Sequence, residues 1–209
     1  GRIVLLPYFA VDPERDDVRC DGRRAVPSAH VYVAMNKPVG VVCAVADKYD
    51  PVVVDLLPER LRRERVYPAG RLDRESEGLL VLTNDGSFAQ SILHPSRGVT
   101  KEYEVLLNIE INERQMERWR NGFEIQGRHV RPIALSALSR EPQGRWLRVV
   151  IGEGLKREVR TMANLAGFSV RTLIRRRVGH MVLENLRVGE FMELSFSELY
   201  TKIFEGGAV

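Results

Sequence analysis

An aspartate between two arginines is the stretch of this chain best suited to chemistry. Asp73 follows Arg71 and Leu72 and precedes Arg74. Neighbouring positive charge favours the ionised carboxylate, so Asp73 is a candidate nucleophile or general base. The two arginines could hold a phosphate backbone beside it. Charge and spacing alone favour a solvated, inert surface loop, because most exposed ion pairs contribute little.

The residues that follow predict how this aspartate is positioned. An acidic turn and Gly78 lead into the apolar run 79–82, and Asn84-Asp85-Gly86 ends the stretch. This order is typical of an exposed loop that enters a buried strand, with a turn beyond it. Over the whole chain, many strands with a few short helices predict an α+β domain around a mostly antiparallel sheet. The predicted strands are 31–35, 67–73, 79–83, 101–107, 123–130, 133–138, 146–151, 170–174 and 191–194, and the predicted helices are 50–57, 87–93, 112–120, 157–166 and 195–204.

Composition permits a polyanionic partner without requiring one. The 209 residues carry a net charge of +4, and 44% of them are hydrophobic, which is enough for a proper core. Residues 156–177 hold seven cations and a single acid, Glu158. Cys20 and Cys43 are far apart and lack metal-ligand spacing, which predicts reduced thiols in a cytoplasmic protein. No apolar run reaches membrane-spanning length.

The amino-acid sequence of the aspartate loop resembles a motif of a known family. Gly70-Arg71-Leu72-Asp73, followed by Glu77-Gly78-Leu79-Leu80 and Thr83-Asn84-Asp85-Gly86, is similar to the catalytic-aspartate motif of pseudouridine synthases. Within that family it resembles the RsuA-like branch, whose members modify ribosomal RNA. The resemblance covers roughly residues 31–195. It implies a mixed, mostly antiparallel sheet that is crossed by a catalytic cleft and flanked by short helices.

The resemblance also implies a reaction. Uridine is isomerised to pseudouridine when the base is cut from the sugar at nitrogen, turned, and rejoined through carbon. No oxidation state changes, so neither a cofactor nor a metal is expected. Asp73 would be the catalytic residue, as a nucleophile on the sugar or as a base on its neighbouring carbon.

Other candidate site residues come from further matches to the family. Residues 153–162 resemble its third motif, in which an arginine pairs with the catalytic aspartate, and Arg160 occupies that position. Lys101-Glu102-Tyr103 resembles a Lys-x-Tyr motif whose ring stacks on the target base, and stacking contributes roughly 1–3 kcal/mol. Residues 172–175 resemble a run whose apolar residue walls the base pocket, which indicates Leu173. Plain alternatives are a helix-surface cation, a half-buried strand tyrosine and a core leucine.

RNA contacts are expected from three cations. Extruding a uridine from its stack costs a few kcal/mol, and a side chain that fills the gap offsets part of this cost. Arg71 is the candidate for that task, although a generic phosphate contact or salt bridge fits it as well. Lys101 and Arg175 are the further candidates for RNA binding. Three successive arginines at 175–177 cannot share one face of a strand.

The sequence predicts two regions and one class of partner. Residues 1–28 resemble the remnant of an N-terminal S4-type RNA-binding domain, and residues 29–209 would form the catalytic domain. The expected partner is structured RNA, most of all ribosomal RNA with the large subunit slightly favoured, bound by a monomer. Small-subunit RNA or transfer RNA are the alternative substrates. Leu155 and Glu158 depart from the third motif, which leaves a non-catalytic RNA-binding or ribosome-assembly protein as the competing hypothesis.

Overall fold

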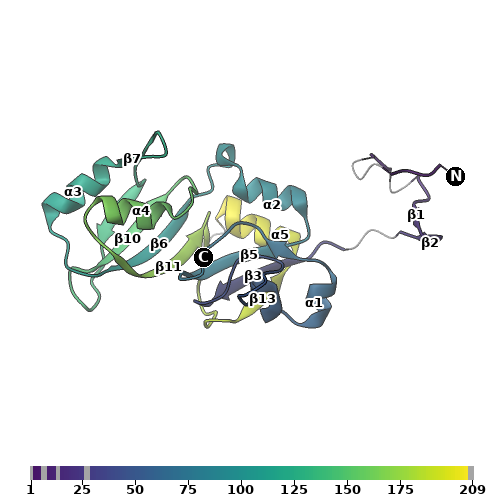
Figure 1. The fold of residues 1–209 in the computed structure, drawn as a ribbon, viewed down its shortest axis with the longest axis horizontal. Coiled ribbons are helices and arrows are strands. Elements are labelled where there is room, and N and C mark those ends of the chain that lie inside the picture. The colour runs from purple at the N-terminus through teal and green to yellow at the C-terminus, as the bar shows by residue number, and fades with distance from the viewer. Residues whose placement is uncertain (1, 6–8, 13–14, 26–28, 207–209) are drawn as a thin grey trace.

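The computed structural model describes residues 2–5, 9–12, 15–25 and 29–206. Near the N-terminus, β1 (Arg19–Cys20) and β2 (Arg23–Arg24) form an exposed antiparallel pair that stands apart from the remaining sheet (Figure 1). The predicted boundary between the two regions, at residues 28 and 29, adjoins residues 26–28, which lie outside the described residues. None of the helices within the described residues has the length and apolar character needed to cross a bilayer.

A nine-stranded mixed sheet forms the centre of the fold, as predicted (Figure 1). In order across the sheet, the strands are β13 (Phe191–Leu194), β3 (Tyr32–Lys37), β5 (Glu77–Thr83), β11 (Val170–Val178), β6 (Lys101–Leu107), β10 (Trp146–Ile151) and β9 (Ala134–Ala137), with β4 (Tyr67–Pro68) paired to β5 and β12 (Met181–Val182) paired to β11.

One parallel pair joins the two halves of this sheet. β5 and β11 run parallel with Arg175 opposite Gly78, and the other strand pairs that the structure describes in this sheet are antiparallel. A Cβ atom at Gly78 would lie 2.3 Å from the backbone oxygen of Arg175, so only glycine allows this approach. The aspartate loop, residues 69–76, directly precedes β5 and is therefore held at the junction.

Short helices cover the sheet, and most of them begin at a side-chain cap. They are α1 (Glu59–Arg63), α2 (Gly86–Leu93), α3 (Glu113–Asn121), α4 (Glu158–Leu165) and α5 (Phe196–Tyr200), which continues as a π-helical turn over Thr201–Glu205. Asp85 caps α2, while Asn112 and Ser195 begin α3 and α5 with capping boxes. A small hairpin of β7 (Phe123–Ile125) and β8 (Arg128–Val130) follows α3. One apolar cluster runs through both halves of the sheet, and a second packs the other face of β3 and β5 against α2 and α5.

The predicted helix 50–57 is wrong. Val52 forms a bridge with Val42, and a 3₁₀ turn over Val53–Leu56 replaces the helix. The carboxylate of Asp50 pairs with Arg74 at 3.0 Å, so it does not act as an N-cap. A tertiary ion pair and a β-bridge therefore outweigh the local capping signal. The true helix, α1, begins one residue after Pro58.

Several predicted strands have different bounds in the structure. The single strand expected at 123–130 is instead the hairpin of β7 and β8, whose turn lies at residues 126 and 127. The strand expected at 67–73 pairs only over β4, after which the chain leaves the sheet as the aspartate loop. The strand expected at 170–174 continues to Val178 in β11. This extension places all three arginines at 175–177 on a strand. A register shift between Arg175 and Arg177 interrupts the alternation of side chains there, so Arg176 and Arg177 both pair with acids of β6.

Candidate active site

A cleft of about 970 Å³ opens at the junction of the two halves of the sheet. The aspartate loop forms one side, the segment 152–159 before and within α4 forms another, and β6 and β11 contribute the floor. Six of the seven predicted site residues line it, namely Arg71, Asp73, Lys101, Tyr103, Leu173 and Arg175. The seventh, Arg160, contacts the aspartate loop from α4.

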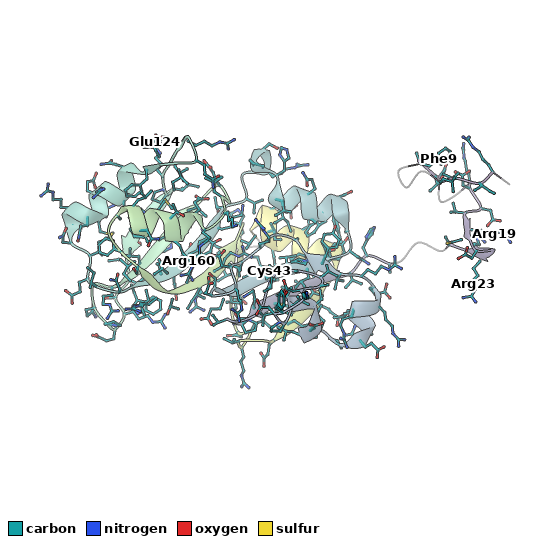
Figure 2. All side chains as sticks on the ribbon, viewed as in Figure 1. Phe9, Arg19, Arg23, Cys43, Glu124 and Arg160 are labelled. Atoms are coloured by element: carbon teal, nitrogen blue, oxygen red, sulfur yellow. The ribbon has the colours of Figure 1, made fainter. Side chains whose placement is uncertain are left out.

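The predicted pairing of Arg160 with Asp73 is present in the geometry. The Nε atom of Arg160 lies 3.6 Å from Oδ2 of Asp73, and it has no hydrogen-bond acceptor in the described part of the chain. The other nitrogens of Arg160 donate to the backbone oxygens of Glu75 and Val170 and to Oγ of Ser76. The guanidinium is therefore fixed, with its remaining donor near the carboxylate. Arg160 lies in the half of the molecule that contains α4 (Figure 2).

The side chain of Asp73 is accessible from the cleft, whereas that of Arg160 is nearly buried. The side chain of Asp73 is 25% exposed, whereas that of Arg160 is 10% exposed. A carboxylate at the wall of a cleft, backed by a buried cation, can meet a ligand without losing its charge compensation. Such an arrangement suits nucleophilic or general-base chemistry on a bound group.

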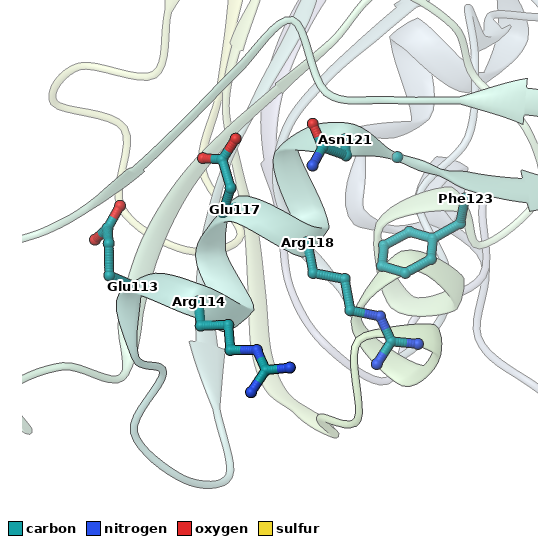
Figure 3. Close-up of a pocket in the computed structure, with 7 residues that line it drawn as sticks. Glu113, Arg114, Glu117, Arg118, Asn121 and Phe123 are labelled. Carbon is teal, nitrogen blue, oxygen red and sulfur yellow. The ribbon is translucent and has the colours of Figure 1, made fainter.

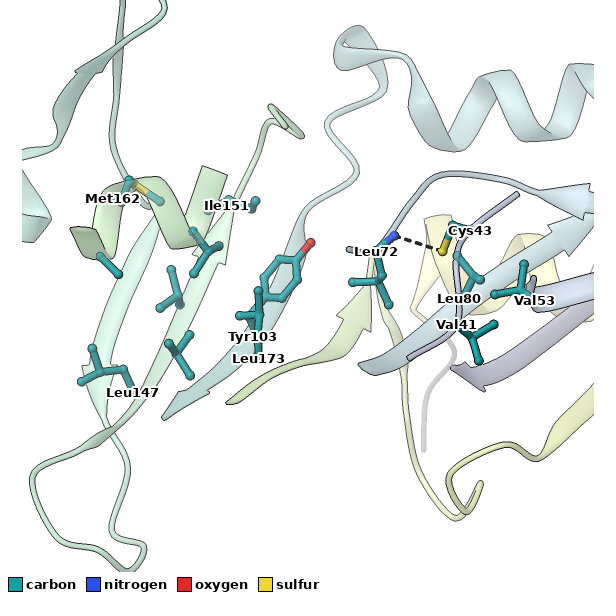
Figure 4. Close-up of a cluster of buried hydrophobic side chains, with 14 of the residues drawn as sticks. Val41, Cys43, Val53, Leu72, Leu80, Tyr103, Leu147, Ile151, Met162 and Leu173 are labelled. Atoms are coloured by element: carbon teal, nitrogen blue, oxygen red, sulfur yellow. Dashed lines mark hydrogen bonds between the residues drawn. The ribbon is translucent and has the colours of Figure 1, made fainter. Parts of the chain in front are cut away.

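An aromatic and aliphatic surface faces the carboxylate side of the cleft. Tyr103 and Leu173 are buried on neighbouring strands, and the Tyr103 hydroxyl is directed toward the segment that carries Leu72 (Figure 4). Both residues also belong to the apolar cluster that runs through both halves of the sheet, so the pocket and core interpretations of them hold together. Lys101 lies two residues before Tyr103 on the same face of β6, and burial lowers the pKa of its ammonium.

Arg175 lies beneath the aspartate loop, where it is 5% exposed. Its Nε donates to the backbone oxygen of Leu79 at 2.7 Å and its Nη1 to that of Arg71 at 3.2 Å. These bonds engage its guanidinium in holding the loop to β5. The two arginines that follow pair with Glu104 and Glu102. The sequence alone does not show which residues of the strand face inward, so it could not identify which arginine is internal.

Lys37 and Cys43 support the same loop, and sequence reasoning missed both. Lys37 is fully buried, and its Nζ donates to the backbone oxygens of Pro38 and Ser76, each at 2.8 Å. The backbone N–H of Leu72 donates to Sγ of Cys43 at 3.2 Å. Burial lowers the pKa of Lys37 and raises that of Cys43. The available signal was the turn sequence Asn-Lys-Pro-Val-Gly at 36–40 directly after a buried strand.

Glu158 is buried at the start of α4, where its Oε2 accepts from the backbone N–H of Leu155 at 2.8 Å. Burial raises the pKa of this carboxyl group. Because the pKa of Glu158 is raised in the folded state, this group contributes most to the free energy of unfolding below its ordinary pKa, about 4.3. The contribution declines as the pH rises through the folded-state pKa.

Glu158→Gln is therefore expected to gain stability relative to wild type as the pH rises from 5 to 8, because glutamine accepts the same bond and cannot ionise. Urea unfolding at both pH values measures this difference. Glu153→Gln, at an exposed position nearby, should show no such trend. Parallel pH curves for Glu158→Gln and wild type would contradict the prediction.

A second, open hollow lies over α3 (Figure 3). It is lined by charged side chains of that helix together with Phe123, above which the Arg118 guanidinium lies at 5.9 Å from the ring centroid. None of the predicted site residues lines this hollow. The cleft at the junction is thus the candidate active site.

Comparison with known proteins identifies the family of this chain. Residues 31–165 match the family described as RNA pseudouridylate synthase. The chain belongs to this family. An uncharacterised RNA pseudouridine synthase of Bacillus subtilis is 37% identical, over 91% of this chain and 80% of the relative. A crystal structure of a pseudouridylate synthase superposes with a TM-score of 0.76 and 27% identity, covering 97% of this chain and 86% of that chain.

A chloroplast relative extends the comparison to plants. A putative ribosomal large subunit pseudouridine synthase of Arabidopsis thaliana is 35% identical over 95% of this chain. The chain spans about half the length of that relative, because the match covers 52% of it. The predicted family, fold and enzyme class are confirmed: this pseudouridine synthase isomerises uridine in RNA. Assignment to the RsuA-like branch stays a prediction.

Proposed function

We propose that this synthase modifies a specific uridine of ribosomal RNA, with the large subunit favoured, and that it belongs to the RsuA-like branch. The observation that carries the proposal is the Asp73 carboxylate, accessible in the cleft and backed by the buried Arg160 guanidinium. The large-subunit preference is supported by the chloroplast relative, which is named a putative ribosomal large subunit pseudouridine synthase.

In the proposed reaction the target uridine leaves its stack and enters the cleft. Tyr103 stacks on the base, Leu173 walls the pocket, and Arg71 occupies the gap in the RNA. The bond between N1 of uracil and C1′ of the sugar breaks, and a bond between C5 and C1′ forms. The proton lost from C5 is balanced by protonation of N1. The Asp73 carboxylate starts the reaction by attacking C1′ or by removing the proton from C2′, and both routes need its charged form.

Further RNA contacts and the setting of the reaction belong to the same proposal. Lys101 would reach the RNA from the cleft, and Arg175 would act by holding the aspartate loop against β5. Residues 1–28 would be the remnant of an S4-type RNA-binding domain, and residues 29–209 the catalytic domain. We place the enzyme in the cytoplasm as a monomer.

Tritium release identifies the substrate class. Transcripts of large-subunit rRNA, small-subunit rRNA and transfer RNA, each labelled with tritium at C5 of uridine, are incubated separately with the enzyme. Release from the large-subunit transcript, at one uridine per molecule, is the expected result. Release from another transcript alone would overturn the large-subunit assignment. If none of the transcripts released tritium, the competing hypothesis of a non-catalytic RNA-binding protein would gain support.

A further inference from the structure

The guanidinium groups of Arg157 and Arg160 both approach Asp73, and they differ in exposure and in how firmly hydrogen bonds hold them. Arg160 is held by three hydrogen-bond acceptors and is nearly buried. The side chain of Arg157 is 44% exposed, and its Nη1 lies 3.5 Å from Oδ2 of Asp73 and 3.0 Å from Oε2 of Glu75. The hydrogen bond from Arg157 lowers the pKa of Glu75. Sequence reasoning did not assign a role to Arg157 or Glu75.

The backbone at Arg157 directs this side chain to the rim of the cleft. Arg157 immediately precedes α4 and has φ 55° and ψ 30°, the left-handed conformation that non-glycine residues adopt at a cost of about 1–2 kcal/mol. Its backbone oxygen accepts from Thr161 in the first turn of α4, and the Glu158 side chain holds Leu155 just before it. The turn is therefore fixed by its neighbours, while the guanidinium at its tip is exposed.

Glu75, the partner of Arg157 at the rim of the cleft, is easy to replace. Glu75 has a side chain 60% exposed, and exposed ion pairs are weak because water competes for both charges. A phosphate accepts two parallel bonds from a guanidinium, as a carboxylate does, so it can take the place of Glu75. A nucleotide whose sugar reaches Asp73 brings its own phosphates to the rim where Arg157 lies.

We propose that Arg157 is a phosphate-binding residue and that Glu75 is its partner when RNA is absent. Without RNA, the Arg157 guanidinium bridges Glu75 and Asp73. When the extruded uridine enters, this guanidinium transfers to a phosphate beside that nucleotide and leaves Arg160 as the sole cation on Asp73. The inference rests on the proposed function, because it requires the sugar to approach Asp73.

Filter binding to the large-subunit rRNA transcript over a series of salt concentrations tests this exchange. Arg157→Gln is expected to reduce the slope of log affinity against log salt by about 0.7–1, the value of one phosphate contact, and Arg157→Lys to keep the slope. Glu75→Gln is expected to tighten binding about two- to fivefold, because it frees Arg157 from a competing carboxylate.

The double variant separates this exchange from a general charge effect. In the Arg157→Gln background, Glu75→Gln should change the affinity no more than Glu153→Gln does, since Glu153 is another exposed acid of the cleft. An unchanged salt slope for Arg157→Gln, or additive effects of the two substitutions, would overturn the proposal. Tritium release by the wild-type enzyme, measured in parallel, tests the proposed function on its own, so the two failures are distinguishable.

Discussion

Asp73→Asn is expected to reduce tritium release by at least about 10⁴-fold, because loss of a reacting side chain removes the chemical step itself. Asparagine has the same size and can remain beside Arg160, but it supplies neither a nucleophilic carboxylate nor a base. The two ion pairs of Asp73, at 3.5 and 3.6 Å, involve a partly exposed side chain, so the fold should survive. RNA affinity should be retained or rise slightly as a negative charge is removed from the cleft.

A matched control for this variant is Asp50→Asn. Asp50 is also paired with an arginine, Arg74, at 3.0 Å, and it belongs to a neighbouring segment outside the cleft lining. Its substitution should keep tritium release within about twofold of wild type, because loss of one partly exposed ion pair is a small perturbation. Equal release by Asp73→Asn and wild type would show that Asp73 is not the catalytic carboxylate.

Gly78→Ala is expected to destabilise the protein by about 3–5 kcal/mol, a large fraction of the stability of an ordinary domain. Gly78 has φ +115°, and an added Cβ would lie 2.3 Å from the oxygen and 2.5 Å from the nitrogen of Arg175. These atoms belong to the backbone of β11 and cannot rotate away. The clash can be relieved only by separating the parallel pair that joins the two halves of the sheet.

Urea unfolding followed by circular dichroism measures this loss. Gly154→Ala is the control, because Cβ at Gly154 would meet nothing within 4 Å. Gly78→Ala should also lose activity, since displacement of β11 moves the Arg175 side chain that holds the aspartate loop. A wild-type unfolding midpoint for Gly78→Ala would show that the β5–β11 contact is not required for stability.

Local signals in the sequence were sufficient for much of the secondary structure. β6, β10 and β13 have the predicted bounds, and α3 begins at the predicted cap. These elements depend on residues two to four positions apart, whose hydrophobic period and capping groups are readable directly. The helix predicted at 50–57 is absent because Val52 bridges to the distant Val42, and Asp50 pairs with Arg74 instead of capping a helix.

What the sequence by itself determined is the family, the candidate carboxylate Asp73 with its expected partner Arg160, and the elements on either side of the aspartate loop. Only the tertiary structure decided that Arg157, at the start of α4, meets the same carboxylate. It also decided that Arg175 is internal while its two successors pair with acids. The physical reason is range: strand register and helix placement depend on packing between distant segments, and no local pattern encodes the face on which a charged side chain emerges.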